Sequence, residues 1–347
     1  MNEPARRDLD KRRPHPRVTA RRFLISAAIL IMSAVVILTV VTAILARMPR
    51  AELRSSSPDA ATPESSRAAQ QRGGYTPTAA GAPSTDIWLA ELGSSDGRWR
   101  VGAPSNITDR DGYDNQPAFE PGGAALLYTS ARDAEQTDIY RYDLVAGVAR
   151  RVTRTSVSEF SPTPLPGGGF SAIRESADGQ LLWRYDDDGG AILPQVQPVG
   201  YHAWGDRERL VMFVLGGGGR PATLHLGNVA AGTAEVIAEN PGRSLHKVPG
   251  RHALSFVRKI TADDWWIEVL DLDSMEFTRW IPTLAGREDY AWTPDRALIM
   301  GDGSKLYQAR AGEDWAEIAD LASIGVSGIT RLAIDDGGTR IAIVANR

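Results

Sequence analysis

A motif of two short apolar strands, joined by a turn rich in Pro, Gly and Asp, recurs through residues 85–347. One position of this motif falls in turn at Pro117, Pro162, His202, His246, Tyr290 and Arg331. The successive spacings are 45, 40, 44, 44 and 41 residues. A repeat of about 40–45 residues that holds four short strands is typical of one blade of a β-propeller. The chain is therefore expected to form an all-β propeller.

The two ends of the repeat region set the number of blades. Only 16 residues follow Arg331, which is enough for two strands. At the other end, residues 85–108 resemble the last two strands of a blade. Joining these halves completes one blade and pairs strand edges that would otherwise be open. The sequence therefore predicts a six-bladed β-propeller of four-stranded antiparallel blades, closed by strands from both ends of the domain.

The best-formed repeat, residues 112–153, carries a recognisable strand and turn pattern. It has Glu-Pro-Gly-Gly at 120–123, Asp-Ile-Tyr at 138–140 and Val-Thr at 152–153. The segment resembles the WD40-like (PD40-type) repeat of the TolB-like β-propeller family. That resemblance implies a periplasmic, protein-binding propeller. TolB's own partners are not implied, because TolB has a separate N-terminal domain and no retained membrane anchor of the kind described next.

An apolar segment precedes the repeats. Residues 23–46 contain no charged residue, no Pro and no Gly. As a helix, 24 residues extend about 36 Å, enough to cross a hydrocarbon core of about 30 Å. Eight Lys and Arg lie in residues 6–22, against three in residues 47–54, so the positive-inside rule places the N-terminus in the cytoplasm. We predict a single-pass signal-anchor in the inner or plasma membrane. The alternative is a cleaved signal peptide, whose apolar region is normally shorter.

The segments around this predicted helix differ in composition from the repeats. Residues 1–22 form a basic cytoplasmic tail. Residues 47–84 are expected to be a disordered linker, because 51–84 hold 8 Ala, 6 Ser, 4 Pro and 3 Thr and lack Phe, Trp, Ile and Val. The propeller at 85–347 is expected to lie outside the cytoplasm, in the periplasm or the extracellular space.

Charge and cysteine content exclude several classes of function. Residues 85–347 carry 37 Asp and Glu against 26 Lys and Arg, so a phosphate backbone would be repelled and nucleic acid is not an expected partner. The chain has no Cys, which excludes disulfides, thiolate metal ligands and cysteine nucleophiles. The sequence also lacks the Gly-x-Ser-x-Gly, His-Glu-x-x-His, Walker and dinucleotide-binding motifs. We therefore predict no catalytic residue from motifs.

The innermost strand of each blade lines the central channel of a propeller, so polar residues at the start of that strand are candidates for binding. They are Tyr201, His202, His246, Asp289, Tyr290 and Arg331. His202, His246 and Asp289, or Glu288 in its place, form a possible divalent metal site. The alternative is a polar channel mouth filled with water. Two further histidines, His225 and His252, fall in strand-like stretches and are expected to be ordinary.

Two functions remain open at this point. The first is a membrane-anchored extracytoplasmic propeller that acts as a protein–protein interaction or envelope scaffold module, with an envelope or membrane protein as its partner and no cofactor. The second is a propeller enzyme, such as a metal-assisted lyase, lactonase or hydrolase, with its site at the channel mouth. A signal-transducing sensor is less well supported, because 22 cytoplasmic residues are too few to fold as an output domain.

Overall fold

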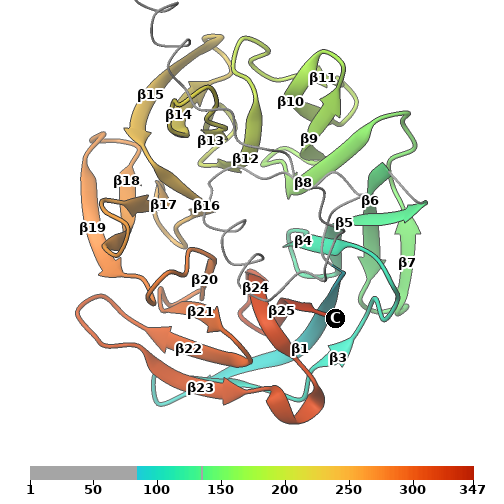
Figure 1. The fold of residues 1–347 in the computed structure, drawn as a ribbon, viewed down its shortest axis with the longest axis vertical. Coiled ribbons are helices and arrows are strands. Elements are labelled where there is room, and N and C mark those ends of the chain that lie inside the picture. The colour runs from blue at the N-terminus through green and yellow to red at the C-terminus, as the bar shows by residue number, and fades with distance from the viewer. Residues whose placement is uncertain (1–83, 134–135) are drawn as a thin grey trace, which may run out of the picture. The chain divides into compact units, whose positions relative to one another are not determined.

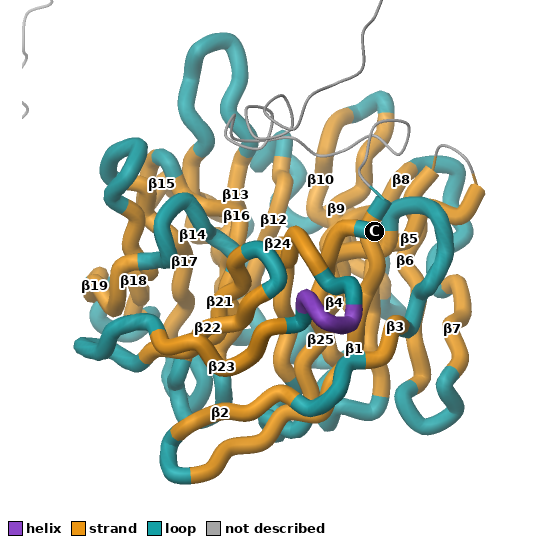
Figure 2. The backbone as a smooth tube through the Cα atoms, turned by 60° about the horizontal axis from the view of Figure 1, so that its bottom comes forward, coloured by secondary structure: helices purple, strands orange, loops and turns teal. Residues whose placement is uncertain are grey.

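The computed structural model describes residues 84–133 and 136–347 of the chain, which form six antiparallel sheets arranged in a ring (Figure 1). Figure 2 shows these strands together with one helical turn of the described residues, η2 (Ala322–Ile324). The predicted tail, membrane helix and linker up to residue 83 lie outside the described residues. Within the described ranges, none of the helical structure has the length and apolarity required to cross a bilayer.

Five of the six sheets are consecutive four-stranded meanders, numbered here as blades 1 to 5. Blade 1 consists of β4 (Asp114–Phe119), β5 (Ala125–Asp133), β6 (Gln136–Asp143) and β7 (Val148–Arg151). Blade 2 consists of β8 (Ser158–Pro164), β9 (Phe170–Ser176), β10 (Gly179–Tyr185) and β11 (Gly190–Ala191). Blade 3 consists of β12 (Val199–Trp204), β13 (Arg209–Val214), β14 (Thr223–Asn228) and β15 (Thr233–Glu239).

The remaining two meanders follow the same order. Blade 4 consists of β16 (Pro241–Lys247), β17 (Ala253–Lys259), β18 (Trp265–Asp271) and β19 (Phe277–Pro282). Blade 5 consists of β20 (Tyr290–Trp292), β21 (Leu298–Asp302), β22 (Lys305–Ala309) and β23 (Ala316–Asp320). In each of these five blades the strand that comes first along the chain lies nearest the centre of the ring (Figure 1).

Blade 6 combines strands from both ends of the described chain. Its inner strands are β24 (Ser327–Ile334) and β25 (Arg340–Asn346), and its outer strands are β1 (Thr85–Ser95), β2 (Arg98–Val101) and β3 (Ser105–Asn106). The C-terminal β25 pairs with the N-terminal β1 from Thr85–Asn346 to Glu91–Arg340, as the blue and red strands of Figure 1 show. The predictions of six blades and of closure by both ends of the domain are confirmed.

The core lies between the blades, because each sheet is covered on both faces by its neighbours. Along β13, Met212 packs with Phe160 of blade 2, while Phe213 on the opposite face packs with Phe256 of blade 4. Both faces therefore need apolar residues, which explains the almost unbroken apolar sequence Leu-Val-Met-Phe-Val of this strand. Each large side chain buried in this way contributes about 1.5–3 kcal/mol to the stability of the ring.

The innermost strands share a local irregularity that shapes the channel. The pairing register shifts within β4, β8, β12, β16 and β24 near the start of each strand. At three of these bulges the backbone φ is positive, at Gln116 (58°), Ser161 (52°) and Gly328 (60°). Positive φ is unusual for residues with a Cβ, and bulges redirect side chains out of the regular pleat. The residues at these positions are consequently turned toward the channel and toward adjacent blades.

Candidate functional site

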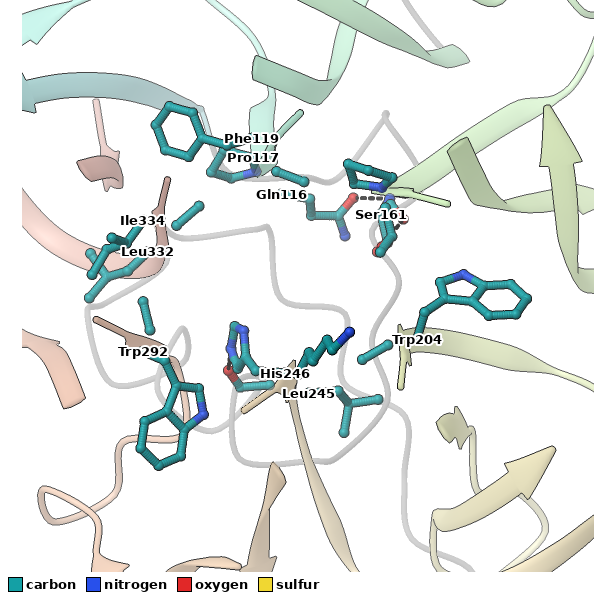
Figure 3. Close-up of a pocket in the computed structure, with 18 of the residues that line it drawn as sticks. Gln116, Pro117, Phe119, Ser161, Trp204, Leu245, His246, Trp292, Leu332 and Ile334 are labelled. Atoms are coloured by element: carbon teal, nitrogen blue, oxygen red, sulfur yellow. Dashed lines mark hydrogen bonds between the residues drawn. The ribbon is translucent and has the colours of Figure 1, made fainter. Parts of the chain in front are cut away.

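A central pocket of about 730 Å³ occupies the channel and is lined by the innermost strands of all six blades and by the turns that follow them (Figure 3). Its size lies within the range typical of ligand sites. The innermost strands contact one another in a closed ring, from β4 through β8, β12, β16, β20 and β24 back to β4. All six of the binding residues predicted from the sequence line this pocket: Tyr201, His202, His246, Asp289, Tyr290 and Arg331.

Side chains from opposite blades meet at one end of the pocket. Arg331 on β24 of blade 6 stacks over the ring of Tyr201 on β12 of blade 3, with its guanidinium carbon 4.8 Å from the ring centroid. Blades 3 and 6 face each other across a six-bladed ring, so this contact closes the channel at that level. We call Tyr201, Arg243, Asp289 and Arg331 the floor of the pocket.

An ion-pair network holds the floor together. Arg243 on β16 contacts Asp289 through two hydrogen bonds, Nε–Oδ1 at 3.1 Å and Nη2–Oδ2 at 2.5 Å. Glu288 lies 3.6 Å from Arg243 and is paired with Lys259 at 2.8 Å. Burial raises the pKa of Asp289, but the charges of Arg243 and Arg331 outweigh it and hold that pKa below its usual value. Asp289 therefore remains ionised and shared between two guanidinium groups.

Arg331 is the least satisfied member of this network. Its nearest carboxylate oxygen, Asp289 Oδ1, is 3.8 Å away, and its side chain is 15% exposed. Among the residues that the structure describes, none accepts a hydrogen bond from its guanidinium. Arg243 neutralises Asp289, and Lys259 neutralises Glu288, so Arg331 carries the excess positive charge of the floor. An arginine has five N–H donors, and none of those of Arg331, which lines the pocket, is hydrogen-bonded to a described residue.

Two polar groups from blades 1 and 2 lie beside the pocket with unused hydrogen-bonding capacity. Gln116 Oε1 accepts hydrogen bonds from the backbone N–H of Ser161 (2.7 Å) and from Thr129 Oγ1 (2.8 Å). Because a backbone N–H fixes which end of the amide is the oxygen, Gln116 Nε2 is a donor; it is buried and has no partner, as is Ser161 Oγ. Figure 3 shows the Gln116 amide nitrogen directed into the pocket.

The two pocket histidines turn toward neighbouring serines. His202 Nε2 lies 2.7 Å from Ser171 Oγ of blade 2, which also accepts a hydrogen bond from Trp204. His246 Nε2 lies 2.8 Å from Ser244 Oγ, and its ring packs on Tyr290 with centroids 4.6 Å apart. Burial lowers the pKa of His202 to about 3 and that of His246 to about 4, the latter partly offset by Asp289. Both imidazoles are neutral at neutral pH.

The predicted metal set is not gathered into one cluster. Within residues 84–133 and 136–347, no three His, Asp or Glu side chains are grouped so as to hold a metal ion. The side chain of Tyr290 is 1% exposed, and its hydroxyl donates to Ser255 Oγ at 2.9 Å, so a role for Tyr290 in binding stays a prediction. It belongs to the buried cluster between blades 4 and 5. Binding of a divalent metal at His202, His246 and Asp289 stays a prediction.

The opposite end of the pocket is formed by the turns after the innermost strands. Four of these turns place a proline at the mouth, and blade 6 places two aspartates there, with one lysine from blade 4. The residues are Pro121, Pro166, Lys247, Pro249, Pro294, Asp335 and Asp336. Lys247 and Asp336 are exposed. A ligand thus meets a proline-rich rim of mixed charge before it reaches the floor.

A second charged cluster joins the turns of blades 3 and 4. The prediction that His252 lies in a strand is wrong, because this residue lies in the turn between β16 and β17. Its Nε2 is 2.8 Å from Asp206 Oδ2 and its Nδ1 is 2.7 Å from Asp273 Oδ1. Hydrogen bonds from its ring nitrogens to the two carboxylates raise the pKa of His252. The alternation of apolar residues could not predict this cluster. Its members lie in turns of two blades, and these turns meet only when the blades pack against each other.

Comparison with known proteins supports the fold more than the function. No protein-family model matches the chain, and no curated protein matches it. Among solved structures, a putative TolB from Agrobacterium tumefaciens superposes with a TM-score of 0.57 at 14% identity, covering 77% of this chain and 99% of that one. The chain shares the propeller fold of TolB.

Two further solved structures are less similar in shape. TolB from Acinetobacter baumannii gives a TM-score of 0.49 at 11% identity, and this chain covers 63% of its length and is itself covered to 74%. Virginiamycin B lyase from Staphylococcus aureus gives 0.43 at 13% identity, with 76% of this chain and all (100%) of that one covered. At such identities the similarity concerns the fold alone.

Proposed function

We propose that this chain is a membrane-anchored, extracytoplasmic β-propeller that binds an envelope or membrane protein partner through its central pocket. The observation that carries the proposal is the pocket itself: about 730 Å³, lined by all six blades, closed at the floor and bordered by turns at the mouth. A cavity that draws its walls from every repeat is the natural receptor site of such a ring.

The chemistry of the floor favours binding over acid–base catalysis. Asp289 is held ionised by Arg243 and Arg331, so it is a weak base. His202 and His246 each engage a serine through Nε2, and burial keeps both pKa values several pH units below neutral. A general acid or base works best when its pKa is near the operating pH, which none of these three groups satisfies. Unpaired donors beside them suit recognition of a ligand.

The anchor and the location form part of the same proposal. The uncharged segment 23–46 and the asymmetry of basic residues around it place the propeller outside the cytoplasm and near the membrane. The Ala/Ser/Pro-rich segment that follows would act as a tether about 30 Å long on average. A propeller held in this way samples partners in the envelope without a fixed orientation.

The test is site-specific photo-crosslinking in intact membranes. A photoreactive phenylalanine analogue is placed at Lys247 or at Asp336, both exposed at the pocket mouth, and as a control at Val145, which is 91% exposed on the outer hairpin of blade 1. We expect one discrete envelope or membrane protein to be captured from both mouth positions and not from Val145. Identification by mass spectrometry then names the partner.

Two results would count against the proposal. Capture of the same protein from Val145 would show that the outer edge of the blades, and not the pocket, is the binding surface. Absence of any crosslinked protein from both mouth positions, with the full-length chain present in the membrane, would exclude a protein partner at the pocket.

A further inference from the structure

We infer that the pocket receives the C-terminal end of the partner's polypeptide chain and that the floor binds its free carboxylate through Arg331, Gln116 and Ser161. This inference rests on the proposed function, because it names the part of the partner that enters the pocket. Three independent features support it: the unbalanced charge of the floor, the unpaired donors beside it, and the depth at which they lie.

The charge of the floor selects an anion. Asp289 is compensated by Arg243 through two hydrogen bonds, and Glu288 by Lys259, which leaves the guanidinium of Arg331 in excess. Asp289 Oδ1 lies 3.8 Å from Arg331 Nη1, which is too far for a hydrogen bond. The N–H donors of Arg331 are therefore not used by Asp289. A planar guanidinium recognises carboxylates through paired N–H···O bonds. An α-ammonium group, in contrast, would be repelled at this position.

Two unpaired donors from blades 1 and 2 line the same pocket as Arg331 and match the needs of a carboxylate. Gln116 Nε2 and Ser161 Oγ are buried, line the pocket and have no partner among the residues described. Both belong to bulged positions with positive φ, a conformation that is unfavourable unless the surroundings support it. A carboxylate has two oxygens that accept several hydrogen bonds, so it is suited to satisfy an arginine, an amide N–H and a hydroxyl together.

The depth of the pocket distinguishes a chain end from an acidic side chain. The lining of blade 1 runs from Gln116, near the start of the innermost strand β4, to Pro121 at the mouth. Five residues of extended strand cover about 16 Å. An Asp or Glu side chain on a segment that lies across the mouth extends by only a few bonds and cannot cover this distance.

Because Arg331 and Tyr201 close the far end, a polypeptide cannot thread through the channel either. The group that reaches the floor must therefore lie at the end of a chain. An extended peptide needs about five residues to cover the same depth as the strand beside it. The ligand class is thus a protein C-terminus with at least its last five residues free to extend.

The experiment uses a library of random decapeptides, biotinylated at the N-terminus and synthesised once with a free C-terminal carboxylate and once as the C-terminal amide. Both forms are selected on the detergent-solubilised full-length chain. The dissociation constant of each selected sequence is then measured in both forms by fluorescence polarisation. Three variants accompany the wild type: Arg331→Gln removes the floor charge, Arg331→Lys keeps it, and Lys247→Gln removes a matched positive charge at the mouth.

We expect the free acid to bind at least about tenfold more tightly than the amide to the wild type, the effect of one charge-assisted hydrogen bond in a sheltered site. Lys247→Gln should keep this ratio, Arg331→Lys should keep part of it, and Arg331→Gln should reduce it to about one. Thermal unfolding of each variant, followed by tryptophan fluorescence, confirms that the ring is intact.

Each contrary result points to a different error. Equal affinity of acid and amide for the wild type would overturn the carboxylate inference and leave the pocket as a protein-binding site. Failure to select any peptide, together with a partner crosslinked at Lys247 or Asp336, would overturn entry of a chain end and leave the proposed function standing. Failure of both experiments would overturn both proposals.

Discussion

Two charged networks join neighbouring blades, and they differ in how fully their members are satisfied. The floor of the pocket links blades 4, 5 and 6 through Arg243, Asp289 and Arg331. The turn cluster links blades 3 and 4, and its members are Asp206, Arg209, His252 and Asp273. In the floor, Asp289 is only 13% exposed, whereas Asp273 of the turn cluster is 72% exposed.

In the turn cluster every cation has close partners. Arg209 donates to Asp206 at 2.9 Å and to the backbone carbonyl of Leu272, and both nitrogens of His252 contact carboxylates within 2.8 Å. The floor contains more deeply buried charges and yet leaves Arg331 without a hydrogen-bonded acceptor among the described residues. In a network that only holds blades together, buried donors are normally hydrogen-bonded. The contrast therefore distinguishes a structural network from a candidate binding site.

The largest effect is expected for Asp289→Asn. This change removes the anion between Arg243 and Arg331, which leaves Arg331 without a carboxylate partner among the described residues and Arg243 with only Glu288 at 3.6 Å. Loss of one partner from a buried ion pair lowers the free energy of unfolding by about 3 kcal/mol or more. Urea denaturation of the full-length chain, followed by tryptophan fluorescence, measures the change.

Asp273→Asn is the matched control for Asp289→Asn, because it removes a carboxylate from the exposed network. We expect it to lower the free energy of unfolding by less than about 0.5 kcal/mol, as is usual for exposed ion pairs. If the two substitutions had equal effects, the distinction between a buried floor and an exposed turn cluster would be wrong.

The second effect is a loss of stability in acid that depends on His202. Burial lowers the pKa of His202 to about 3, so the unfolded chain takes up this proton first as the pH falls below about 6.5. The neutral imidazole of His202 therefore makes its full contribution to the free energy of unfolding above about pH 6.5. Below that pH the free energy of unfolding falls by about 1.4 kcal/mol per pH unit, or by about 2 kcal/mol between pH 7 and 5. His246, with a pKa of about 4, acts in the same direction.

Urea denaturation at pH 7, 6 and 5 of the wild type and of His202→Gln measures this slope. The variant should lose about 2 kcal/mol less than the wild type between the two extremes. A variant with the same pH dependence as the wild type would show that His202 is solvated and titrates normally, contrary to its burial in the structure.

The third expectation concerns Arg331→Gln and separates binding from stability. Since Arg331 donates no hydrogen bond to the described residues, its loss removes mainly the stacking on Tyr201, which contributes about 1 kcal/mol. Asp289 keeps its two bonds to Arg243. Denaturation of the full-length variant should therefore show a loss of about 1 kcal/mol or less. A loss as large as that of Asp289→Asn would identify Arg331 as a structural residue of the floor.

The smallest effect is expected for His252→Gln, and it has the opposite pH dependence. Asp206 and Asp273 raise the pKa of His252, so its stabilising charge is fully present below about pH 6.5 and is lost as the pH rises through the raised pKa. The side chain is 34% exposed, so solvent screening keeps the effect small. Between pH 6 and 8 the wild type should lose about 1 °C more in Tm than the variant. If the Tm of the wild type instead fell more than that of the variant as the pH is lowered from 8 to 6, the raised pKa of His252 would be contradicted.

Much of the fold could be predicted from the sequence because blade formation is local. Alternation of apolar residues and turn residues recurs every 40–45 positions, and these signals need no knowledge of distant contacts. Even ring closure followed from counting, since the 16 residues after Arg331 and the segment 85–108 are each half a blade. The predicted anchor at 23–46 rests on composition alone and lies outside the described residues.

The candidate site was predicted only in part. Tyr201, Asp289 and Arg331 were named because the start of the innermost strand is a repeat position. Arg243 was missed, since it lies three residues before His246 in a segment whose pairing is displaced by a bulge. Gln116 lies next to the repeat position at Pro117, but no sequence signal indicated that its amide would reach Ser161 on the next blade.

The sequence by itself determined the type and number of blades and their closure, because strand periodicity and turn chemistry act over a few residues. Only the tertiary structure decided which charges meet. Arg331 and Tyr201 are 130 residues apart in the chain and become neighbours when opposite blades face each other. Whether a cation is neutralised or left open to a ligand depends on such distant contacts. The ring therefore follows from local patterns, whereas its floor follows from packing.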